Sequence, residues 1–146
     1  MAVDVLTETV IARRPAEVAA YAADPDNAPR WYANITSVEW VTDPPLSVGS
    51  KVAFEAQFLG RPLCYTYEIV EYEPGARLVM RTAQGPFPME TTYTWQPADG
   101  GGTRMTLRNR GEPSGFSRVA APVMVAAMRR ANRADLARIK ALLETT

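Results

Sequence analysis

The feature that most constrains the fold is a change of hydrophobic period near residue 111. Between residues 35 and 110, apolar residues tend to alternate with polar ones, which is the period of a half-buried β-strand. Between residues 123 and 143 they recur every three or four positions, as on one face of an α-helix. The pattern predicts an antiparallel sheet with one apolar face, which the long C-terminal helix must cover.

Six strands are predicted in the first of these regions, because turn clusters rich in Gly and Pro divide it at short, regular intervals. This spacing indicates that consecutive strands are antiparallel neighbours. The predicted strands are 35–41, 51–59, 63–72, 77–82, 89–95 and 104–110.

The N-terminal segment adds one strand and two short helices. Residues 3–12 are rich in β-branched side chains, which favours a strand. Pro15 is typical of a first helical turn, and Asp24-Pro25 ends that helix before a second short one around Trp31. We therefore predict an α+β fold with one domain over residues 1–146, in which a curved seven-stranded antiparallel sheet wraps around the C-terminal helix, with two short helices between strands 1 and 2.

A strongly curved sheet cannot bring all its inner side chains into contact with one helix, so we expect a cavity beneath the short helices. Tyrosine hydroxyls on the inner face need partners, since a buried unpaired hydroxyl costs about 1–3 kcal/mol. Methionines there are adaptable to varied apolar shapes. The residues predicted to contact a small hydrophobic ligand are Trp31, Phe54, Phe58, Tyr65, Tyr67, Met80, Met89, Tyr93, Met105, Asn109, Met124 and Met128.

Each of these side chains has an alternative role in plain core packing. Trp31 and Tyr32 either contact the ligand as lid residues or fix the short helices to the sheet. Asn132 lies close to the inner apolar stripe of the helix, either at the boundary between its buried and exposed faces or deep in the cavity. The charged residues of the C-terminal helix, Asp135 among them, are predicted to face solvent.

Composition excludes several function classes. The chain has no His and a single Cys, Cys64, so we expect no metal site, no cofactor, no internal disulfide and no Ser–His or Cys–His catalytic pair. Lys+Arg and Asp+Glu balance at 16 each, which disfavours a nucleic-acid partner. No stretch reaches the ~20 apolar residues of a membrane span, and the N-terminus lacks a signal-peptide pattern, so we expect a cytoplasmic protein.

Several short motifs occur in a family-specific order: 12–18, Trp31, 48–51, 73–78, 100–106 and 135–144. Together they make nearly the whole chain resemble the polyketide cyclase/dehydrase and lipid transport family of the START-like superfamily, which has the helix-grip fold. The resemblance implies a cavity and not a particular reaction, because members of the superfamily have many functions.

Two functions follow as expectations, and a third stays open. The first is the binding of a small hydrophobic molecule, such as a lipid, a polyketide-like aromatic or an isoprenoid. The alternative is an enzyme similar to the cyclase/aromatase branch, with Tyr65, Tyr67 and Tyr93 as general acids and no identifiable base. An interaction or regulatory domain that senses a ligand is the third possibility.

Overall fold

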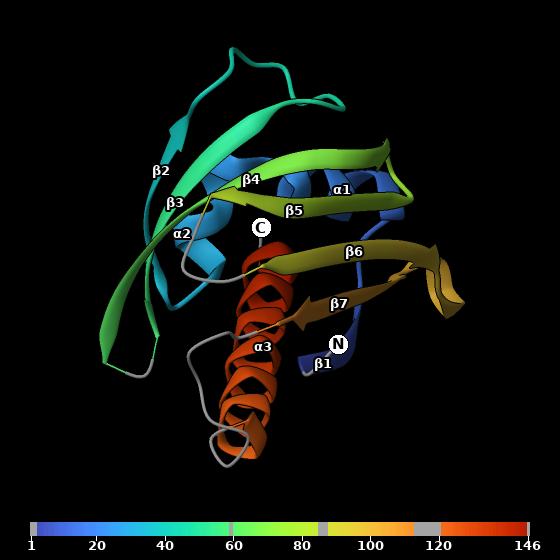
Figure 1. The fold of residues 1–146 in the computed structure, drawn as a ribbon. Helices are drawn as coiled ribbons and strands as arrows, with labels where there is room; N and C mark the ends of the chain where they lie inside the picture. Colours follow the sequence, from blue (N-terminus) through green and yellow to red (C-terminus); the bar gives the residue numbers. More distant parts are fainter. Residues whose placement is uncertain (1–2, 59, 85–87, 113–120, 146) are drawn as a thin grey trace.

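The computed structural model describes residues 3–58, 60–84, 88–112 and 121–145, and it confirms the predicted fold (Figure 1). Seven antiparallel strands form one sheet in the order β1-β7-β6-β5-β4-β3-β2. The strands are β1 (Val3–Ile11), β2 (Ile35–Trp40), β3 (Lys51–Phe58), β4 (Arg61–Glu73), β5 (Arg77–Gln84), β6 (Met89–Pro97) and β7 (Thr103–Gly111). The helices are α1 (Pro15–Ala23), η1 (Pro25–Asn27), α2 (Ala28–Trp31), η2 (Asp99–Gly101) and α3 (Ala121–Glu144).

The sheet curls around α3, as Figure 1 shows. The first strand pairs with the last, from Val3 opposite Gly111 to Ile11 opposite Thr103. The pairing of β4 with β5 is irregular between Thr66 and Tyr67 and again between Ile69 and Glu71. Such irregularities bend a strand and increase its twist, so they lie where the sheet has to curve.

One face of α3 is buried against the sheet along its length. Met124 and Met128 pack with Val3 and Val5 in one cluster, whereas Leu136 and Ile139 belong to the main core. These positions repeat at the spacing of one helix face, as the sequence pattern predicted.

The C-terminal end of α3 is attached to the segment between β1 and α1. The side chain of Arg13 donates a hydrogen bond to the carbonyl of Leu143 over 2.8 Å, and the backbone N–H of Ala12 donates to Glu144 over 2.9 Å. Lys140 donates to the carbonyl of Val10 over 2.7 Å. These contacts fix the direction in which α3 crosses the sheet.

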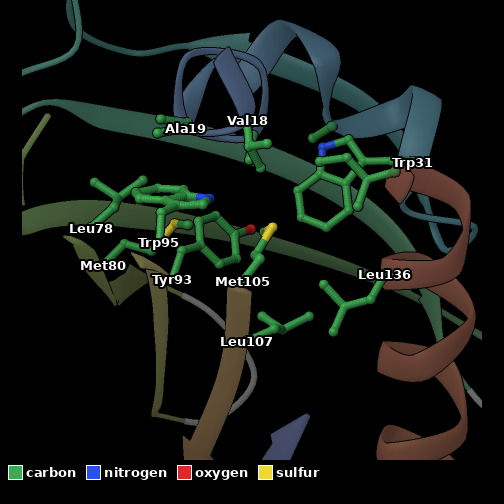
Figure 2. Close-up of a cluster of buried hydrophobic side chains, with 14 of the residues drawn as sticks. Val18, Ala19, Trp31, Leu78, Met80, Tyr93, Trp95, Met105, Leu107 and Leu136 are labelled. Atoms are coloured by element: carbon green, nitrogen blue, oxygen red, sulfur yellow. The ribbon is translucent and has the colours of Figure 1, made fainter. Parts of the chain in front are cut away.

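The short helices α1 and α2 cover one end of the curved sheet, and Trp31 joins them to the core. Its side chain is 0% exposed, and Figure 2 shows it packed in one cluster with Tyr93, Trp95, Met105 and Leu136. Trp31 therefore has the wedge position, in which it fixes the short helices to the sheet.

No helix among the described residues is both long and apolar enough to cross a membrane. Within the same ranges, no three His, Cys, Asp or Glu side chains are grouped as a metal ion would require.

Candidate functional site: a cavity between the sheet and α3

A cavity of about 140 Å³ lies between the inner face of the sheet and α3, beneath α1, η1 and α2. An engineered apolar cavity of about 150 Å³ in another protein admits benzene, so this space suits a small ring compound. The lining includes exposed Gln57 and half-buried Asn34 and Leu63, which places an opening toward solvent beside the end of the β3–β4 hairpin. Ala22, Ala23 and Ala28 form part of the roof, where small side chains leave the space free.

The structure brings most of the residues predicted to contact the ligand to this cavity. Those that line it are Phe54, Tyr65, Tyr67, Met80, Met89, Tyr93, Asn109, Met124 and Met128. Trp31 and Met105 do not line it, because both are 0% exposed and packed in the adjacent core. The side chain of Phe58 lies outside the described part of the structure.

Three polar side chains, Tyr67 on β4, Thr91 on β6 and Asn109 on β7, form a hydrogen-bonded chain along the cavity wall. Thr91 donates its hydroxyl hydrogen to the side-chain oxygen of Asn109 over 2.8 Å. The hydroxyls of Tyr67 and Thr91 lie 3.0 Å apart, so Tyr67 must be the donor in this second bond. The hydroxyl hydrogen of Tyr67 is therefore already used in the bond to Thr91. Toward a ligand, the hydroxyl oxygen of Tyr67 can act only as an acceptor.

Tyr32 and Tyr93 form a second polar pair, with their hydroxyl oxygens 2.5 Å apart. Tyr32 follows α2, and Tyr93 comes from β6, so this bond connects the short helices to the sheet across the cavity. Only one of the two hydroxyl hydrogens is used in their mutual bond. No acceptor within the described ranges takes the other hydrogen, which leaves one donor at the cavity wall.

Asp135 of α3 is buried at 2% exposure, although its charge had suggested the solvated face of the helix. One carboxylate oxygen accepts a hydrogen bond from the backbone N–H of Ala33 over 3.0 Å. Loss of water on burial raises the pKa of Asp135 to about 6, and the Ala33 bond and nearby Arg138 only partly oppose this rise. Among the described residues that line the cavity, no other side chain is charged.

Asn132 lies one turn before Asp135 and also lines the cavity. It is 5% exposed, and its amide nitrogen is buried without a hydrogen-bond partner among the described residues. The structure thus places Asn132 in the cavity wall, the second of its two predicted positions. An unpaired buried donor costs about 1–3 kcal/mol, which a suitable ligand would relieve.

The cavity tyrosines are neutral at physiological pH. Burial raises the pKa of Tyr67 to about 12, although the bond to Thr91 opposes the rise. Burial is also the main cause that raises the pKa values of Tyr32, Tyr65 and Tyr93 well above the ordinary value of a tyrosine. The site is therefore apolar over most of its wall, with neutral hydroxyls and one carboxylate.

Sequence reasoning missed Asp135 as a member of the site and left the role of Tyr32 open. The signal for Asp135 was an interruption of the apolar stripe of α3. Asn132 and Asp135 continue the spacing set by Met124 and Met128, and polar side chains at such positions face the interior.

An antiparallel sheet curled around one C-terminal helix, with a cavity between them, defines the helix-grip class of folds. The model of the polyketide cyclase/dehydrase and lipid transport family matches residues 2–144, and the chain belongs to this family. A search of curated protein sequences finds no match.

Solved structures with the same fold share little sequence with this chain. TTHA0849 from Thermus thermophilus is 20% identical, with a TM-score of 0.84 over 98% of this chain and 99% of that chain. The Zhui aromatase/cyclase from Streptomyces sp. R1128 is 17% identical, with a TM-score of 0.80 over 97% and 93%. A START superfamily protein from Mycobacterium smegmatis is 12% identical, with a TM-score of 0.76 over 95% and 98%.

Proposed function

We propose that the protein binds a small, largely apolar molecule in the cavity between the sheet and α3. The observation that carries this proposal is an open space of about 140 Å³ whose wall is mostly apolar and aromatic. A ligand would gain about 25 cal/mol for each Å² of apolar surface that leaves water, and a few polar groups would orient it. The family description, which names polyketide cyclases, dehydrases and lipid transport, is consistent with such a ligand.

Filling the cavity tests this proposal. Ala131 of α3 lines the space, and Ala131→Trp should occupy it with an indole ring. We expect the small neutral fluorophore 1-aminonaphthalene to bind the wild-type protein saturably and the variant at least about tenfold more weakly. Fluorescence titration measures both affinities.

Ala137→Trp is the matched control, because Ala137 is exposed on the same helix and does not line the cavity. It should bind the fluorophore like the wild-type protein. Circular dichroism establishes that both variants are folded. If neither the fluorophore nor a panel of apolar compounds binds the wild-type protein more tightly than about 1 mM, the proposal is wrong.

An enzyme of the cyclase or dehydrase kind is the second candidate, and the position of Asp135 favours it. A buried carboxylate with a raised pKa can accept a proton near neutral pH, which supplies the base that the sequence did not reveal. The tyrosines fit the role of general acid less well, because burial raises their pKa values and holds their protons more tightly.

This second candidate predicts water loss from a poly-β-ketone thioester, which mass spectrometry detects as a lighter product. Asp135→Asn should lower the rate at least about a hundredfold while fluorophore binding persists. Equal rates with and without the wild-type protein would exclude the enzyme hypothesis and leave ligand binding intact.

A further inference from the structure

Two polar side chains of the cavity that have unpaired atoms in the described structure lie on α3. Asp135 uses one carboxylate oxygen for the N–H of Ala33, and its second oxygen has no hydrogen-bond partner among the described residues. The amide nitrogen of Asn132 has none either. The two residues are three positions apart on a helix, so their side chains lie on the same face. This face offers a ligand one free acceptor and one free donor.

The distribution of charge around Asp135 disfavours a fatty acid as the ligand of this cavity. In the described structure, the titratable groups of other elements that interact electrostatically with Asp135 are Tyr32 after α2, Tyr93 on β6 and Tyr65 on β4. All three are neutral hydroxyls. Within the described part of the chain, the cation that acts on Asp135 is Arg138, which is exposed on α3 and does not line the cavity.

Among the described residues that line the cavity, an anionic ligand would therefore meet a carboxylate and no cation, in a poorly solvated space. A ligand hydroxyl, in contrast to a carboxylate, is neutral and can both donate and accept a hydrogen bond. Its hydrogen can be donated to Asp135, and its oxygen can accept the hydrogen of the Asn132 amide. A hydroxyl is thus complementary to both unpaired groups without adding charge.

We propose that the ligand of this cavity is a neutral apolar molecule with a hydroxyl group, which donates to Asp135 and accepts from Asn132. The proposal rests on the ligand-binding function inferred above and specifies the chemical class of the ligand. It also predicts that carboxylate-bearing molecules of the same size are rejected.

Naphthalene and three of its derivatives, all of similar size, test this selectivity by isothermal titration calorimetry at pH 7.5. They are naphthalene, 2-naphthol, 2-methoxynaphthalene, which accepts but cannot donate, and 2-naphthoate, which is anionic. We expect 2-naphthol to bind at least about tenfold more tightly than naphthalene and 2-methoxynaphthalene, because hydrogen bonds to charged groups are the stronger ones. We expect 2-naphthoate to bind more weakly than naphthalene.

Two substitutions attribute the selectivity to the proposed groups. Asp135→Asn should reduce the preference for 2-naphthol and raise the affinity for 2-naphthoate by about tenfold or more, because the like charge is gone. Asn132→Leu should weaken the binding of 2-naphthol and leave that of naphthalene unchanged. Asp99→Asn is the control for a lost negative charge, since Asp99 is exposed in η2, and it should retain wild-type selectivity.

The outcomes separate this inference from the function on which it rests. If all four compounds bind the wild-type protein with equal affinity, or if 2-naphthoate binds most tightly, the inference is overturned and ligand binding stands. If none of them binds and the fluorophore does not bind either, the proposed function itself fails. Unchanged selectivity in Asp135→Asn would also overturn the inference.

Discussion

Trp31→Ala should lower the free energy of unfolding by about 3–5 kcal/mol, as expected for removal of a large buried aromatic side chain. Trp31 is 0% exposed, and its ring lies 4.2 Å from that of Tyr32 and 5.7 Å from that of Tyr93, measured between ring centroids. The substitution would remove the wedge between the short helices and the sheet. Urea denaturation followed by circular dichroism measures the change.

Two further variants make this prediction specific. Trp40→Ala, at a half-buried position where the indole N–H donates to Asp26 over 3.0 Å, should cost about 1–2 kcal/mol. Trp31→Phe should cost less than Trp31→Ala, because it keeps a ring and removes a buried N–H that lacks a partner in the described structure. A loss below about 1 kcal/mol in Trp31→Ala would show that Trp31 is not a wedge in the core.

Asp135→Asn should make the protein more stable at neutral pH, although it removes a residue of the proposed site. The pKa of Asp135 is about 6 in the folded protein and 3.8 as its ordinary value. Because the folded state holds this proton more tightly, the contribution of Asp135 to stability is greatest below pH 4 and is lost as the pH rises through 6. The rise of about two pKa units corresponds to about 3 kcal/mol.

The variant carries no charge at this position and should keep the bond from the N–H of Ala33. It should therefore exceed the wild-type free energy of unfolding by about 2–3 kcal/mol at pH 7.5 and by little at pH 4. Urea denaturation at several pH values checks this, with the exposed Asp99→Asn as the control that should show no such trend. A wild-type protein that is the more stable of the two at pH 7.5 would contradict the burial of an ionised Asp135.

The strand pattern predicted the inward-facing residues well, because the face of a strand depends only on the parity of its residues. Phe54 on β3, Tyr65 and Tyr67 on β4 and Tyr93 on β6 all line the cavity. Parity does not show how deep a side chain lies, however. Met105 lies on the predicted inner face of β7, but its side chain is buried in the core and does not line the cavity. The depth of an inward-facing side chain depends on how sharply the sheet curves around α3.

The polar end of the cavity could not be predicted in the same way. Asp135 continues the spacing of the apolar stripe, but a charged side chain on a broad helix face is also compatible with solvent. The N–H of Ala33 that bonds Asp135 comes from a segment 102 residues away, and sequence spacing says nothing about such a contact. The raised pKa of Asp135 follows from this burial, and so it became visible only in the structure.

The most direct test of ligand binding in the cavity is a crystal structure of the protein grown with 6-bromo-2-naphthol, in which anomalous scattering locates the bromine. We expect one bromine peak inside the cavity, with the naphthol oxygen within hydrogen-bond distance of Asp135 and Asn132. A cavity filled by side chains, or a bromine peak found only on the outer surface, would contradict the proposal that this space receives the ligand.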